Sequence, residues 1–303
     1  MRKFDNSEYE ALVKDLIGDT FYVETSFRGK IAKLRQFAEV IVRKLLDLDP
    51  NIEMTLGKKD ITNKISSLNN NELILKNLQN INKNGSNYTH TQKKNEVLEE
   101  EFDNTVDSLL NLLSVFFINY FEKYEFGSNE KVMASFSLLP PIVRYKVLMF
   151  LYSKHPQNIS IIDKLVLATL KSFNADEAFS WVEERKDTLN KMKTISEKVF
   201  NEISEKMGID VALELQNSGP SNMYQLCKQK ILKIGNVIEL KGNLYSDFES
   251  ALPFYQEKGM LEGTEPEILE FNDIMSFVYL GRKKKLQEIS GDSDSYIIMN
   301  FIS

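Results

Sequence analysis

Cysteine and histidine are the scarcest chemically active residues of this sequence. Its 303 residues include one cysteine, Cys227, and two histidines, His90 and His155. A metal site built from these residue types needs about three or four ligands, and a disulfide needs two cysteines. The sequence also lacks a glycine-rich phosphate loop and an HExxH motif. We therefore expect no metal, no other cofactor and no disulfide, and the lone cysteine favours a reducing, cytoplasmic location.

Proline, glycine and long apolar runs are also in short supply. The chain has seven prolines and 13 glycines, and its most apolar stretch is the 13 residues 109–121. A membrane span needs about 20 apolar residues, so we interpret this stretch as a buried helix and expect no membrane contact. Alternating strand patterns are rare, whereas helical periodicity runs through most of the chain. The sequence predicts an all-α fold with one candidate strand at residues 237–240.

The charge balance offers no general attraction for nucleic acid. Lys and Arg number 38 against 44 Asp and Glu, which gives a net charge of -6. Any RNA contact therefore needs a local basic patch. The basic run at residues 282–285 falls in an expected helix from 266 to 289, where we interpret it as a solvent-exposed face.

Two apolar stripes with spacings of four and three residues mark the longest expected helices. One comprises Phe27, Ile31, Leu34, Ala38, Ile41, Leu45 and Leu48, and the other comprises Leu98, Phe102, Val106, Leu109, Leu113, Phe116 and Tyr120. With shorter helices between them they predict an antiparallel bundle. Shorter paired helices follow. We expect an N-terminal helix at 1–19, a bundle at 20–128, an α-α layer of paired helices at 129–218 and a small, mainly helical C-terminal module at 219–303.

A polar segment between the third and fourth bundle helices contains one of the two histidines. Residues 82–87 read Asn-Lys-Asn-Gly-Ser-Asn and lead to His90, a pattern typical of a helix C-cap and a loop. Residues 34–39, Leu-Arg-Gln-Phe-Ala-Glu, are similar to the first long helix of the HEPN superfamily, and Gly85 and His90 match a Gly and a His of its motif. Residues 20–126 thus resemble HEPN domains of bacterial and phage-related defence proteins.

The resemblance implies a dimeric helical bundle that cleaves RNA without a metal, as a toxin or ribonuclease of host defence. His90 would act as the general acid and base, because the pKa of histidine lies near neutrality. The position of the family's arginine is occupied by Asn82 or Lys83. Lys83 keeps the spacing and the charge but not the bidentate guanidinium. By the same resemblance, Asn84, Asn87 and Arg35 are expected to bind phosphate.

Two other interpretations stay open. The missing arginine and the acidic balance favour a catalytically degenerate HEPN scaffold that binds a protein partner, forms a homodimer or senses phage infection. The other interpretation is a plain helical adaptor whose likeness to HEPN is accidental, because helical bundles can share a fold without sharing a function. Local capping or packing equally explains His90. His155 is expected in a turn, and Cys227 and Trp181 in the core.

Overall fold

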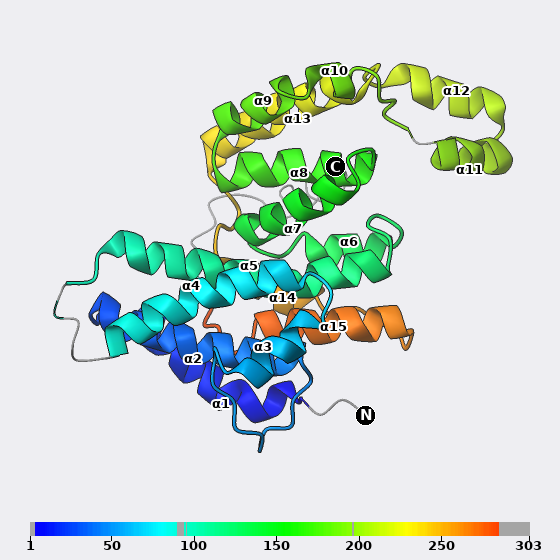
Figure 1. Cartoon of the computed structure of the whole chain (residues 1–303). Coiled ribbons are helices and arrows are strands. Elements are labelled where there is room, and N and C mark those ends of the chain that lie inside the picture. Colours follow the sequence, from blue (N-terminus) through cyan, green and yellow to red (C-terminus); the bar gives the residue numbers. More distant parts are fainter. Residues whose placement is uncertain (1–3, 90–93, 95, 196, 285–303) are drawn as a thin grey trace. The chain divides into compact units, whose positions relative to one another are not determined.

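The computed structural model describes residues 4–89, 94, 96–195 and 197–284 (Figure 1). In these ranges every regular element is a helix, which confirms the all-α fold. The chain divides into two compact units, one made of residues 1–125 and 256–285, and one that contains residues 126–255. None of the helices in the described ranges has the length and apolar character needed to cross a bilayer.

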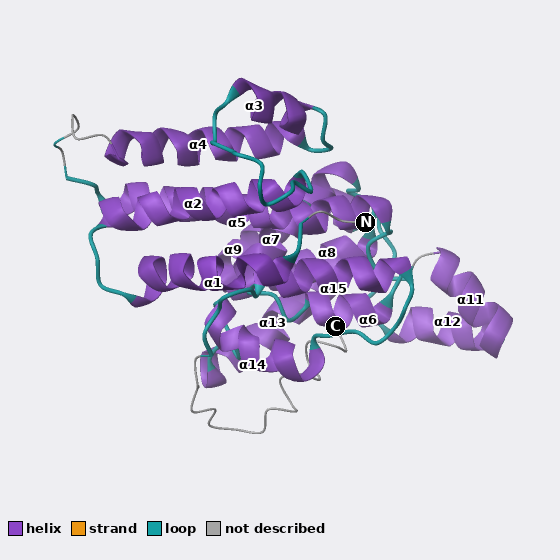
Figure 2. Ribbon diagram, turned by 90° about the horizontal axis from the view of Figure 1, so that it is seen from below, coloured by secondary structure: helices purple, strands orange, loops and turns teal. Residues whose placement is uncertain are grey.

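The first unit combines the N-terminal helices with one helix from the C-terminal part of the chain (Figure 1). Its elements are α1 (Asn6–Ile17), the π-helical turn η1 (Gly18–Tyr22), α2 (Phe27–Leu45), α3 (Lys59–Ser66), α4 (Asn71–Thr89), α5 (Glu99–Lys123) and α15 (Pro266–Val278). Figure 2 shows α1, α2 and α4 running side by side. The predicted stripe of α2 forms its buried face, with Ile31, Leu34 and Ile41 at most 1% exposed.

The two longest predicted helices run in parallel rather than antiparallel. The rings of Phe27, at the start of α2, and Phe102, at the start of α5, lie 5.4 Å apart. At the other end, Leu45 of α2 and Phe116 of α5 line one common cavity. The expected antiparallel neighbour of α5 is α4 instead. The bundle is therefore up-down-up, with α4 opposed to both α2 and α5.

Amide and hydroxyl side chains fix the register of α4 against α5. The Nδ2 of Asn84 donates to the Oγ1 of Thr105 at 3.0 Å, and the Nδ2 of Asn80 donates to the Oγ of Ser108 at 3.1 Å. Farther along, Asn111 donates to Asn77 at 3.1 Å and Asn70 donates to Asn119 at 2.8 Å. Residue numbers rise on α4 as they fall on α5, which is the mark of an antiparallel pair. Each bond also satisfies a polar group that the helix contact would otherwise leave without a partner.

The second unit consists of shorter paired helices (Figure 1). They are α6 (Glu130–Phe136), α7 (Pro141–Lys154), α8 (Ile159–Ser172), α9 (Ala175–Glu183), α10 (Lys186–Leu189), α11 (Glu197–Met207), α12 (Ile209–Ser218) and α13 (Met223–Lys241), and α14 (Phe248–Lys258) crosses the division between the units. Helix α7 packs on α8, α8 on α9, and α13 on both α8 and α9. Asparagine side chains cap the first turns of α6, α8, α9 and α13.

Several local expectations are corrected. Residues 237–240 belong to α13 and form no strand. The last described helix, α15, ends at Val278, so Arg282 and Lys283 follow it and lie over the aromatic rings of Phe21 and Tyr22. The two units also divide the chain differently from the expected modules, because residues 256–285 belong with the N-terminal bundle.

Candidate functional site

The segment expected to carry the nuclease site is helical. Helix α4 continues through residues 82–87 and ends at Thr89, so the predicted C-cap and loop at these positions are wrong. The side chain of Lys83 is exposed to solvent. His90 and the side chain of Asn87 lie outside the described residues.

Asn84 is committed to helix packing. Its amide donates to the Oγ1 of Thr105, and that hydroxyl donates in turn to the main-chain oxygen of Glu101 at 2.7 Å. Thr105 is fully buried. The amide of Asn84 therefore connects α4 to α5, and its expected role in phosphate binding stays a prediction.

Arg35 does lie beside the expected segment, but as a packing residue. Its side chain crosses Gly85, where an added Cβ would come within 2.6 Å of the Cδ of Arg35. Its Nε is buried and has no hydrogen-bond partner among the described residues, so this atom is inaccessible to an RNA phosphate. Burial raises the pKa of the nearby Glu39 carboxyl, and the charges of Arg35 and Arg43 oppose that rise. Gly85 thus provides the room for a close approach of α2 and α4.

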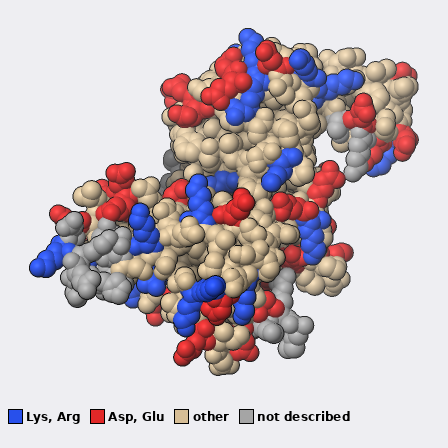
Figure 3. Space-filling model, in the orientation of Figure 1, with Lys and Arg blue, Asp and Glu red and all other residues tan. Residues whose placement is uncertain are grey.

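The face of the molecule shown in Figure 3 presents no extended basic track for RNA among its described residues. On the face shown in Figure 3, basic and acidic side chains of the described residues are interspersed, with neutral residues between them. Of the residues expected to form the site, the structure brings Arg35 to Gly85, directs Asn84 toward α5 and leaves Lys83 exposed.

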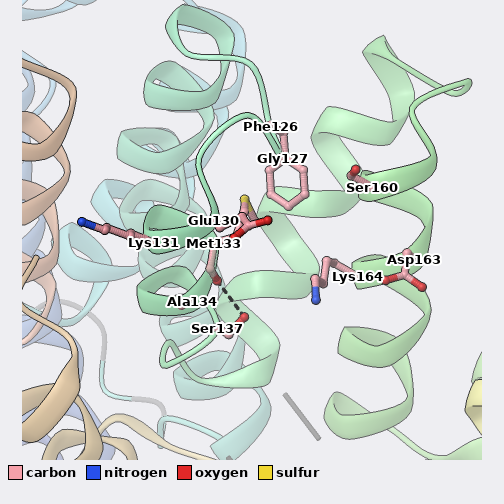
Figure 4. A pocket seen from close by; sticks show the side chains of 10 residues that line it. All are labelled: Phe126, Gly127, Glu130, Lys131, Met133, Ala134, Ser137, Ser160, Asp163 and Lys164. Atoms are coloured by element: carbon pink, nitrogen blue, oxygen red, sulfur yellow. Dashed lines mark hydrogen bonds between the residues drawn. The ribbon is translucent and has the colours of Figure 1, made fainter. Parts of the chain in front are cut away.

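A cavity that the sequence analysis did not anticipate lies in the second unit (Figure 4). Its volume is about 560 Å³, and residues of α6, α8 and the turn before α6 line it. Phe126 and Met133 supply an apolar wall, and Lys164 projects into the space between α6 and α8. Lys131 also lines the cavity, but its amino group extends away from it. The turn is held close to α8, because a Cβ on Gly127, whose φ is +92°, would lie 2.9 Å from the Oγ of Ser160.

Cationic side chains gather next to this cavity. Burial lowers the pKa of Lys164, and the charges of Lys230 and Arg144 lower it further, while Asp163 opposes them. Burial likewise lowers the pKa of Lys171 to about 7, with Arg144 and Lys164 adding to the effect. Asp163 forms an ion pair with Lys230. Basic side chains from α7, α8 and α13 thus interact with one another around Lys164, and Asp163 opposes their charge there.

Part of this cluster has a signal in the sequence. Lys164 and Lys171 lie seven residues apart on α8, whose other residues are mainly apolar, and that spacing places two residues on the same helix face. Arg144 occurs on α7 between Val143 and Val147, which are both fully buried. Basic residues on buried faces are rare unless they are paired. Their convergence from three helices is visible only in the fold.

Neither metal-binding geometry nor similarity to known proteins assigns a role to this chain. In the part of the chain that the structure describes, no cluster of three or more His, Cys, Asp or Glu side chains is arranged to hold a metal ion. Comparison of the chain with protein-family models, curated proteins and solved structures finds no match.

Proposed function

We propose that this protein is a helical scaffold that binds a protein partner. The observation that carries the proposal is the helical hairpin of α11 and α12, in which large apolar side chains face solvent. Met207 is 63% exposed, Ile209 60%, Leu215 46% and Leu213 43%. Among the described side chains of the two helices, only that of Ala212 is buried. Exposed apolar residues gathered in this way mark an interaction surface more often than a free one.

The charge of the hairpin indicates which kind of partner it fits. Residues 197–218 contain five acidic residues and two lysines, a net charge of -3. Figure 3 shows mostly neutral residues with scattered acidic ones over α11 and α12. A second copy of the chain would bring like charges together, which opposes association. The best-matched occupant is therefore a basic amphipathic helix of another protein, packed against the apolar side chains.

A synthetic amphipathic helix with leucine on one face and lysine on the other tests this surface. Fluorescence anisotropy should give saturable binding to the full chain, and Ile209→Glu should weaken it more than tenfold, because burying such a side chain contributes about 1.5–3 kcal/mol. Leu240→Glu is the matched control, since Leu240 is 84% exposed on α13 outside the hairpin. Equal binding by the two variants would refute the proposal. If light scattering shows that the wild type self-associates and that Ile209→Glu does not, the partner of this surface is a second copy of the chain rather than a basic helix.

A HEPN-type, metal-independent ribonuclease of prokaryotic or phage-related defence is the second candidate. The observation in its favour is Lys83, which is exposed on α4 with six residues between it and His90. An RNA cleavage assay should compare the wild type with Lys83→Ala and His90→Ala. Lys76→Ala is the control, because Lys76 is also exposed and lies two turns earlier on the same helix face. RNA degradation that persists in His90→Ala would exclude this function.

A further inference from the structure

Arg144 is the most buried charged residue among those that the structure describes in the second unit. The residue is 6% exposed, and its Nε and Nη2 atoms are buried without a hydrogen-bond acceptor among the described residues. A guanidinium cannot lose its proton, so burial does not neutralise it as it does a lysine. Its positive charge therefore stays next to the cavity, where it favours an anion.

The surroundings of Arg144 hold it in place without neutralising it. Its Cζ lies 5.9 Å from the ring centre of Tyr245. Tyr245 is itself buried, and its hydroxyl donates to the main-chain oxygen of Ser137, one of the residues that line the cavity. A cation over an aromatic ring is stabilised, but the ring supplies no acceptor for the remaining N–H groups.

The neighbouring charges add to the imbalance. Lys164 and Lys171 on α8 both interact electrostatically with Arg144, and Lys230 on α13 interacts with Lys164. Asp163 pairs with Lys230, and Glu130 is the other acidic residue at the cavity. Among the described residues, the three cations Arg144, Lys164 and Lys230 therefore outnumber the two carboxylates of Asp163 and Glu130. A potential of this sign, in partly desolvated surroundings, attracts a small anion.

The cavity provides room for more than an ion. Its volume of about 560 Å³ lies in the range of small-molecule sites. The ring of Phe126 and the thioether of Met133 can contact an apolar body, while the amino group of Lys164 reaches the same space (Figure 4). An apolar wall combined with one convergent cation fits a ligand with an aromatic body and a compact anionic group.

We propose that the second unit binds a small phosphate monoester with an aromatic body in the cavity between α6 and α8. Lys164 contacts the phosphate, Phe126 and Met133 contact the ring, and the charge of Arg144 balances the remaining charge of the ligand. The site is separate from the hairpin of α11 and α12, so it can fail or hold independently of the scaffold function.

Isothermal titration calorimetry of the full chain with phenyl phosphate, inorganic phosphate and phenol tests each part of this site. Phenyl phosphate should bind, inorganic phosphate should bind at least tenfold more weakly, and phenol should not bind. Lys164→Gln should weaken phenyl phosphate binding at least tenfold, which corresponds to one charge-assisted hydrogen bond. Lys131→Gln should change it less than twofold, because that amino group points away from the cavity.

The opposite results are equally clear. Equal affinity for phenyl phosphate and inorganic phosphate would refute the aromatic subsite. Absence of phenyl phosphate binding to the folded wild type, or binding unaffected by Lys164→Gln, would overturn the site altogether. Arg144→Met and Arg144→Lys both remove the permanently charged guanidinium, because a lysine buried at this position would lose its proton, and both should weaken phenyl phosphate binding. If the Arg144 variants fail to fold, the comparison of Lys164→Gln with Lys131→Gln still tests whether the cavity binds phenyl phosphate.

Discussion

Lys171 should make the stability of the second unit depend on pH in an unusual direction. Burial and the charges of Arg144 and Lys164 lower its pKa to about 7 in the folded state, whereas an unfolded lysine titrates near pH 10.4. Between these values the unfolded chain binds a proton that the folded chain has lost. The free energy of unfolding therefore rises with pH across this window, and it stops changing below about pH 7.

Other groups restrict the range in which this effect is isolated. Burial raises the pKa of the Cys227 thiol to about 12, so above about pH 8.5 the unfolded thiol loses its proton first, and this contribution offsets the rise due to Lys171. Between pH 7 and 8.5 the contribution of Lys171 dominates. A difference of one bound proton between the unfolded and folded states, over 1.5 pH units, changes the free energy of unfolding by about 2 kcal/mol.

Trp181 makes the measurement specific to the second unit. It is the one tryptophan of the chain, it is 7% exposed, and it lies on α9, which packs on α8 and α13. Urea unfolding followed by its fluorescence, at constant ionic strength, should show the free energy rising by about 2 kcal/mol from pH 7 to 8.5. Lys171→Met should remove most of the slope and stabilise the protein at pH 7. An unchanged slope in this variant, or a flat wild-type profile, would refute the reasoning.

Three further changes probe the packing of the helices. Lys44→Met should destabilise the first unit by about 3–5 kcal/mol in urea unfolding followed by circular dichroism. It removes an ion pair in which the Nζ of Lys44, whose side chain is 7% exposed, lies 2.9 Å from the Oδ2 of Asp273. A loss below about 1 kcal/mol would show that the ion pair contributes little. Gly85→Ala should destabilise by about 1 kcal/mol against Arg35, whereas in an Arg35→Ala background it should stabilise by about as much, since alanine is the better helix former. Cys227 should resist a thiol reagent at pH 8 until urea is added, given its raised pKa and 1% exposure.

Burial that follows a helical period could be predicted from the sequence. The stripes gave the buried faces of α2 and of α5 from Leu109 to Tyr120, since each position needs only its own residue type and spacing, whereas Leu98 precedes α5 and is 61% exposed. The expected core positions of Cys227 and Trp181 are confirmed at 1% and 7% exposure. His155 is also confirmed in a turn, as the C-cap residue of α7.

Segments whose conformation depends on a distant partner were predicted wrongly. Residues 82–87 have the composition of a loop, but α4 continues there because Asn84 bonds to Thr105 and Gly85 accommodates Arg35. Residues 237–240 are mainly β-branched and apolar, yet α13 continues to Lys241 and is ended by Gly242, whose φ is +76°. In both cases tertiary contacts or a more distant cap overrode the local preference.

The polar residues predicted on α2 and α4 and the cationic cluster of the second unit differ in how far their polar groups find hydrogen-bond partners. At α4, the amide of Asn84 has its acceptor in Thr105, and the aliphatic part of Arg35 covers Gly85. At α7 and α8, by contrast, the described residues offer no acceptor to the Nε and Nη2 of Arg144, and burial lowers the pKa of two lysines. Such a cluster lowers stability unless an anion accompanies it. Ligand binding is therefore better supported in the second unit, and an anion that fits there should raise the free energy of unfolding reported by Trp181 with the logarithm of its concentration relative to Kd.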